Sequence, residues 1–192
     1  MKSILSFNLT LMLLACLVHA PDARAEEGYS ALFIWKRGKN KTEKWKLQAA
    51  PGKVRLESFD KKKAYLFVEG QGTTYLQIPE KRARSSRLPF PIMALNNINA
   101  DIIQSGNPCW KGGGECKQAG KRKKFGRLCE RWIQLSTDIE GKVKGKDIYL
   151  VDEKLRVIVY RRLVDGSRLE LRRFKTGDQP AEAFVVPEDF AR

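Results

Sequence analysis

Histidine is almost absent from this chain of 192 residues: the single one is His19, near the N-terminus. Ser-His and Cys-His nucleophile pairs are therefore excluded from the rest of the chain, because each needs a histidine base. Cysteine is scarce as well, and three of the four lie in one segment, as Cys109, Cys116 and Cys129. A structural zinc site typically needs four thiolate or imidazole ligands, one pair of them separated by two to four residues. Gaps of six and twelve residues do not fit this spacing, and we expect no metal site.

The sequence also lacks a Walker-type phosphate loop. Its glycine-rich stretch WKGGGE, residues 110–115, has neither the lysine-serine or lysine-threonine end nor the following helix that such a loop needs. Carboxylate pairs remain conceivable for acid-base chemistry, either Asp147 with Asp152 or Glu188 with Asp189. Their surroundings are typical of turns and tails, where acidic residues end strands. We therefore predict no catalytic residues, no cofactor and no enzyme activity.

Long apolar runs are missing too. The longest, Ile4–Val18, is short for a membrane span and is interrupted by polar residues. Ala23 and Ala25 follow at the two small-residue positions of an A-x-A cleavage site. We predict that residues 1–25 are a signal peptide cut after Ala25, and that residues 26–192 form one exported domain.

The stretch LLAC, which ends at Cys16, leaves a second interpretation of the N-terminus open. Cys16 would then be the lipid anchor of a lipoprotein. Apolar residues continue after this cysteine, where a lipoprotein usually turns polar, and so an ordinary signal peptide is favoured.

Acidic residues are in the minority, with 22 against 37 lysines and arginines, and the net charge is +15. Removing residues 1–25, which carry Lys2, Arg24 and Asp22, leaves +14. Such a charge predicts attraction to anionic partners, and an exported protein meets envelope lipid or polysaccharide before nucleic acid. We expect no nucleic-acid partner, because no recognition motif accompanies the basic residues. A solvated basic surface without a specific partner explains the charge equally well.

The densest basic cluster is KRKK, at Lys121, Arg122, Lys123 and Lys124, and we expect it to contact an anion or a partner together with Trp110. Further clusters are residues 61–63 and 81–84. The alternative is that all of these lie at strand ends, where lysines keep turns soluble and edges unpaired.

What the sequence does contain is strand-and-turn patterning. EKWKLQA, PGKVRLESF and RLELRRF alternate apolar with polar residues, which indicates strands with one buried and one wet face. The Asp-Gly turn of VDGS is a strong hairpin signal. A long connection follows Pro79 and contains an apolar stretch, Ile92–Ile103, that periodicity assigns to neither helix nor loop. We predict a single antiparallel β domain of roughly eight strands.

The clustered cysteines predict a disulfide, because an exported chain folds in an oxidising compartment. Three cysteines allow three pairings. Cys109 with Cys116 closes a short loop whose glycines can adopt the conformation that a ring needs, and we favour this pair. Cys129 then remains on a strand, as a buried thiol or as one half of an intermolecular bridge.

Three segments together resemble a known group of proteins. They are NPC…C…GRLCERW, the strand segment DIYLVDEKLRVIVY, and DGSRLELRRFKTGDQPAEAFVVPEDF with its AxxFxVPxxF tail. They resemble uncharacterised bacterial periplasmic proteins with a LolA/LolB-like, lipoprotein carrier-like fold. The resemblance implies a mostly β (α+β) architecture in the periplasm. A strongly curved antiparallel sheet, an unclosed half-barrel, would have a short helical or loop insertion over its concave face.

This fold implies an apolar cleft, and we expect a binding or carrier protein for a lipid, an acyl chain or another apolar ligand. The basic surface would meet anionic headgroups or membrane. The expected cleft residues are Phe90, Ile92, Met93, Leu95 and Ile98 on the connection and Trp45, Leu56, Val157 and Val159 on the sheet. Residue by residue, ordinary core packing is the favoured explanation for them. The alternative function is a non-catalytic envelope assembly module that contacts an acidic protein.

Overall fold

The computed structural model describes residues 28–38, 41–87, 107–109 and 114–191. Their regular structure is almost entirely β. The strands are β1 (Tyr29–Arg37), β2 (Lys41–Ala50), β3 (Lys53–Ser58), β4 (Lys63–Val68), β5 (Gly72–Gln77), β6 (Arg82–Ser85), β7 (Cys116–Lys124), β8 (Arg127–Thr137), β9 (Val143–Asp152), β10 (Ile158–Arg162) and β11 (Arg168–Thr176). A short 3₁₀ helix, η2 (Ala181–Phe184), follows. Within these ranges no helix is both long and apolar enough to cross a membrane.

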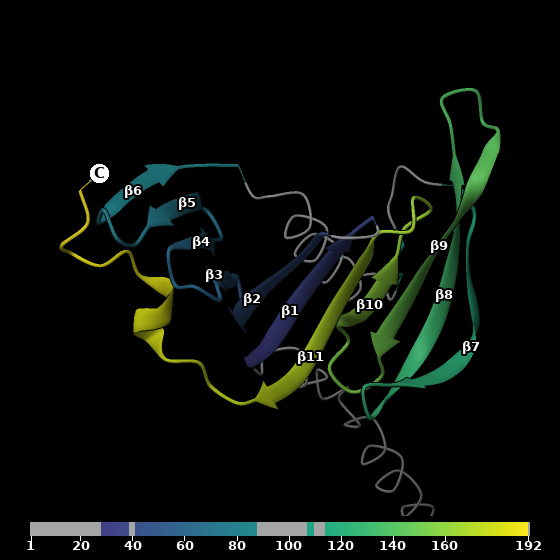
Figure 1. The fold of residues 1–192 in the computed structure, drawn as a ribbon. Helices are drawn as coiled ribbons and strands as arrows, with labels where there is room; N and C mark the ends of the chain where they lie inside the picture. Colours follow the sequence, from purple (N-terminus) through teal and green to yellow (C-terminus); the bar gives the residue numbers. More distant parts are fainter. Residues whose placement is uncertain (1–27, 39–40, 88–106, 110–113, 192) are drawn as a thin grey trace, which may run out of the picture.

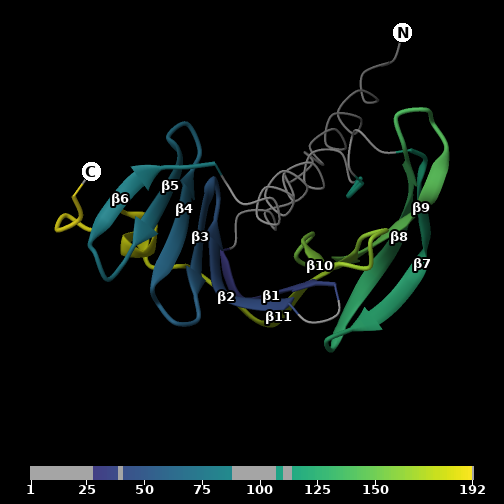
Figure 2. The same ribbon diagram turned by 45° about the horizontal axis from the view of Figure 1, so that its top comes forward.

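All strands of the described residues belong to one antiparallel sheet, in the order β6-β5-β4-β3-β2-β1-β11-β10-β9-β8-β7. Neighbouring strands are mostly consecutive in sequence, and the last strand, β11, returns to pair with β1 in the middle. The sheet bends into a deep trough whose two edges, β6 and β7, stay apart (Figures 1 and 2). The unclosed, strongly curved antiparallel half-barrel is therefore confirmed. The insertion predicted over its concave face and the predicted signal peptide lie outside the described residues.

One hydrophobic cluster extends over most of the concave face. It joins Phe33 and Leu171 at the centre of the sheet with Leu56 on one wing and Tyr149 on the other, and each is at most 1% exposed. Side chains from strands this far apart in the sheet converge only on the inner side of its curvature. The register explains why these residues share one face. Phe33 lies opposite both Trp45 and Leu171, so alternate residues of three neighbouring strands point inward together.

The outer face of the first wing is covered by the C-terminal segment. Phe184 is buried, while Val186 and Phe190 pack against the cluster of Ala64, Leu76 and Ala83 on β4 to β6. In Figure 2 this segment lies outside the trough. The AxxFxVPxxF tail thus carries the apolar side chains that bury an otherwise exposed sheet face.

The described sheet has eleven strands rather than roughly eight. Two strands escaped prediction, β6 in the connection after Pro79 and β7 in the basic segment. Both consist largely of arginine, lysine and small residues, because edge strands need few apolar side chains. The basic run of residues 121–124 forms the end of β7, and the turn follows it at Phe125 and Gly126, with φ of 52° and 78°.

Candidate ligand-binding face

An aromatic row crosses the first wing of the concave face. The register aligns Leu47, Leu56, Tyr65, Tyr75 and Arg84 side by side on five successive strands, β2 to β6. The rings of Tyr65 and Tyr75 have centroids 5.0 Å apart, and Trp45 on β2 lies 5.9 Å from Tyr65. Tilted pairs at this spacing are favourable aromatic contacts. The row is a continuous apolar track from the buried core towards the β6 edge.

The track becomes more exposed towards this edge. Trp45 and Leu56 are buried, Tyr65 and Tyr75 are half-buried, and Arg84 is exposed. Burial raises the pKa of the Tyr65 hydroxyl above its ordinary value, and the nearby Tyr75 and Glu43 raise it further. The neutral phenol is therefore favoured, and the middle of the row is an uncharged, apolar surface.

Cations border the row. The Arg84 guanidinium lies 5.1 Å from the Tyr75 ring centroid, and the Lys63 ammonium lies 5.0 Å from that of Trp45. Both side chains are exposed, so their charges remain available while their stems follow the aromatic rings. Apolar rings beside free cations suit a molecule that has an apolar chain and an anionic end.

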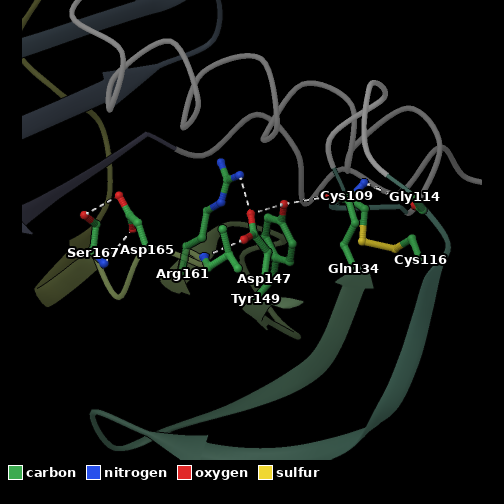
Figure 3. A network of polar contacts seen from close by, with 10 residues as sticks. Cys109, Gly114, Cys116, Gln134, Asp147, Tyr149, Arg161, Asp165 and Ser167 are labelled. Atoms are coloured by element: carbon green, nitrogen blue, oxygen red, sulfur yellow. Dashed lines mark hydrogen bonds and ion pairs between the residues drawn. A yellow bond between two sulfur atoms is a disulfide. The ribbon is translucent and has the colours of Figure 1, made fainter. Parts of the chain in front are cut away.

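The other wing carries a buried polar network (Figure 3). Arg161 Nη2 donates to Asp147 Oδ2 at 2.9 Å, and the Val164 backbone N–H donates to Asp147 Oδ1 at 3.0 Å. The Tyr149 hydroxyl donates to Gln134 Oε1 at 2.8 Å, and the Arg161 guanidinium lies 4.8 Å from the Tyr149 ring centroid. Arg161 is 6% exposed and Asp147 8%, so the two charges compensate each other away from water.

This network connects the sheet to the disulfide. Gln134 Nε2 lies 3.5 Å from the Gly114 carbonyl oxygen. The Gly114 N–H donates to the Leu135 carbonyl at 2.9 Å, and a Cβ at Gly114 would lie only 3.0 Å from that oxygen. Any larger residue would press against the β8 backbone here, so glycine is favoured where the loop meets β8. The Cys109–Cys116 disulfide is confirmed, with Cα atoms 6.1 Å apart.

Cys129 is a free, fully buried thiol. Desolvation raises its pKa to about 11, with a further contribution from the nearby Asp152 carboxylate. A protonated thiol of this kind is a poor nucleophile. Cys129 thus acts as a small apolar side chain in the described structure.

The structure does not bring the predicted sheet residues of the cleft together. Trp45 and Leu56 share the concave cluster, but Val157 and Val159 pack with Cys129 in a second cluster on the opposite face. The reason is a bulge between Ile158 and Tyr160 that interrupts the alternation of β10. The remaining cleft residues, Phe90, Ile92, Met93, Leu95 and Ile98, lie outside the described residues.

The predicted anion-contact residues occupy the end of edge strand β7, except Trp110, which lies outside the described residues. Lys121 forms an ion pair with Glu153 at 2.8 Å. Lys124 stacks near the rings of Phe125 and Tyr160, at 4.9 and 4.7 Å. Arg122 and Lys123 are exposed.

The candidate carboxylate pairs do not form a catalytic dyad. Asp147 and Asp152 lie five residues apart on one strand and point to opposite faces, where Arg161 and Arg127 respectively neutralise them. Asp189 forms an exposed ion pair with Lys81. No group of three or more potential metal ligands occurs in the described part of the chain.

A surface hollow of about 450 Å³ lies at the ends of β1 and β11. Its lining residues are Lys36, Gly38, Asp165, Gly166 and Arg168. Trp45, Leu56, Val157 and Val159 do not line it, and its charged described lining does not suit an apolar ligand.

Sequence reasoning missed Tyr65 and Tyr75, whereas Lys63 and Arg84 belong to the basic clusters 61–63 and 81–84 that it did identify. The sequence does not indicate which face of the strands that carry Tyr65 and Tyr75 is concave. The useful signal was the recurrence of aromatic residues at inward positions of successive hairpin strands, ending in a basic strand.

These features define an unclosed antiparallel half-barrel with an aromatic, cation-bordered inner face. No protein-family model and no curated protein matches the sequence. Among solved structures, MucB in complex with MucA(peri) gives a TM-score of 0.54 at 13% identity, covering 88% of this chain and 57% of that chain. An uncharacterized conserved protein from Thermus thermophilus gives 0.54 at 9% identity, covering 86% and 89%.

A putative outer membrane lipoprotein-sorting protein domain from Vibrio parahaemolyticus gives a TM-score of only 0.35, at 11% identity, covering 85% of this chain and 90% of that chain. This score is too low to carry an argument. The chain spans little more than half the length of the MucB chain that it matches. At these identities the first two likenesses show a shared half-barrel fold, and they do not show a shared activity.

Proposed function

We propose that this protein is a non-catalytic envelope protein that binds an amphiphile with an apolar chain and an anionic end. The observation that carries the proposal is the Trp45–Tyr65–Tyr75 aromatic row, flanked by the exposed cations Lys63 and Arg84. Residues 1–25 would direct export, and residues 26–192 would act as one periplasmic domain. A lipid or a fatty acid has the required chemistry.

In this proposal the apolar chain lies along the aromatic row, where each methylene removed from water contributes about 0.8 kcal/mol. The anionic end lies near Arg84, which follows Tyr75 at the β6 end of the row and whose long side chain can reach it. The resulting orientation is fixed: the chain points towards the core cluster and the head towards the β6 edge. An uncharged ligand of the same shape would lose the contact with the cations.

A second candidate function is binding of an envelope protein. It is supported by the fold likeness to MucB, whose crystal structure is a complex with MucA(peri). The chain spans 57% of that protein and shares 13% identity, so the likeness suggests a scaffold that can hold a protein partner, without identifying one.

The test of the amphiphile proposal is a fluorescence titration of the mature chain with cis-parinaric acid and with its methyl ester. We expect the acid to bind more tightly than the ester. Tyr75→Ala should weaken both ligands about tenfold, because it removes contact with roughly two methylenes. Arg84→Gln should weaken the acid and leave the ester unchanged. Phe59→Ala, which removes a ring that is 65% exposed in a turn, is the matched control and should change neither.

Equal effects of Tyr75→Ala and Phe59→Ala would show that the aromatic row does not hold the chain. If Arg84→Gln weakened the acid and the ester equally, the charge at the β6 edge would have no role in orienting the ligand.

A further inference from the structure

The two edge strands of the sheet differ in whether another segment of the chain pairs with their outer side. At β6, the Ala83 N–H donates to the Ala191 carbonyl at 2.8 Å, and the Ala191 N–H donates to the Lys81 carbonyl at 2.8 Å. The C-terminus therefore continues the sheet in parallel at this edge. At the other end, β7 pairs with β8 on one side, and no strand of the described residues lies on its other side (Figure 1).

Edge strand β7 is long, at nine residues, whereas β6 has four. Unpaired backbone groups on such an edge can pair with another extended chain. A bulge between Gln118 and Lys121 interrupts the register with β8. Regular pairing with β8 continues from Lys121 to Lys124, so this half of β7 presents the other edge of an extended backbone to an incoming strand.

The charge of β7 indicates which chain would pair with it. Of its five basic residues, Lys121 is engaged with Glu153, and Lys124 stacks on aromatic rings. Lys117, Arg122 and Lys123 are exposed, and no ion pair joins them to an acidic residue in the described ranges. Arg122 lies opposite Cys129 and Lys123 opposite Leu128, so consecutive side chains carry positive charge to both faces of the edge.

We propose that β7 is a docking edge for an extended, acidic segment of a partner protein, which joins the sheet as an additional strand. Backbone hydrogen bonds hold the segment, and its carboxylates meet Lys117, Arg122 and Lys123. A membrane surface fits less well, because it meets charges on one side only and offers no strand of backbone donors and acceptors. The inference is independent of the amphiphile proposal, since β7 and the aromatic row lie on opposite wings of the sheet.

Isothermal titration of the mature chain with three probes tests this. The first is a capped octapeptide in which glutamate alternates with valine. The second has the same sequence with every peptide nitrogen methylated, which keeps the charge but removes the donors. The third is vesicles of phosphatidylglycerol. Of the two peptides, we expect only the first to bind, with a dissociation constant in the micromolar range, roughly 8 kcal/mol or less of binding free energy. Any binding of the vesicles should be independent of Arg122 and Lys123, because the concave face on the other wing would account for it.

Arg122→Glu with Lys123→Glu should weaken this binding about tenfold or more, because like charges then face each other across the edge. The matched control is Lys44→Glu with Lys46→Glu, the same charge change at exposed positions of the internal strand β2, and it should change binding less than about twofold. Near-ultraviolet circular dichroism verifies that both variants stay folded.

Absence of binding by the first peptide would overturn the proposal. Equal binding of the methylated peptide, or equal weakening by both variant pairs, would overturn it in favour of unspecific charge attraction. Binding of the vesicles that is lost in the Arg122→Glu, Lys123→Glu variant, with neither peptide bound, would assign the basic edge to a membrane surface instead.

Discussion

At the scale of single residues, the buried Asp147 carboxylate and Tyr149 hydroxyl both have hydrogen-bond partners. Asp147 receives hydrogen bonds from Arg161 and from the Val164 backbone, and Tyr149 donates to Gln134. Removing one member would leave an unpaired buried group, which is costly. Cys129 is a different case. It packs with Leu150, Val157 and Val159 near the Arg127–Asp152 ion pair, and desolvation raises its pKa, so the thiol keeps its proton.

Cys129 gives a prediction at this scale. With a pKa of about 11, roughly one thiol in a thousand is ionised at pH 8, against about one in four for an ordinary cysteine. Iodoacetamide at pH 8 should therefore leave the folded protein unmodified and alkylate one thiol in urea, as measured by intact mass. Because the folded-state pKa is raised, the stability that this thiol contributes is present below about pH 9 and is lost as the pH rises towards 11.

The control places a thiol on the surface, as Ser85→Cys in a Cys129→Ala background, since Ser85 is exposed on β6. This variant should react while folded. Stoichiometric alkylation of Cys129 in the native protein would contradict the burial and the raised pKa described here.

At the scale of elements, alternation in the sequence predicts the internal strands of the sheet but not its two edge strands. Alternation located β2, β3 and β11, since each has one face in the core. It missed β6 and β7, because an edge strand rich in arginine or lysine has almost no apolar pattern. It also misassigned Val159, because a bulge changes the face on which a side chain lies without leaving a signal in the sequence.

The C-terminal segment gives the prediction at this scale. Phe190→Ala should lower the free energy of unfolding by about 1–2 kcal/mol, because a half-buried ring leaves the cluster of Ala64, Leu76 and Ala83. Val185→Ala, in the same segment but 57% exposed, is the matched control and should have little effect. Urea denaturation measures both changes. Equal midpoints for the two variants would mean that the tail does not stabilise the sheet.

At the scale of the whole molecule, the curvature of the sheet brings side chains of distant strands into one hydrophobic cluster. The half-barrel could be predicted from the hairpin pattern and the family resemblance. The aromatic row could not, because Trp45, Tyr65 and Tyr75 become neighbours only through the register of β2 to β5. The disulfide was predictable because Cys109 and Cys116 lie close together in the sequence and export was expected. The identity of a ligand, in contrast, depends on groups that only the fold assembles.

The amphiphile proposal is tested most directly by native mass spectrometry of the chain exported to the periplasm and purified without detergent. The wild type and the Tyr65→Ala, Tyr75→Ala double variant are compared. We predict that the wild type carries the mass of one anionic lipid or fatty acid, and that the double variant retains about a tenth of this occupancy or less. A wild type without any bound amphiphile, or equal occupancy in both proteins, would contradict the proposal that the concave aromatic face binds it.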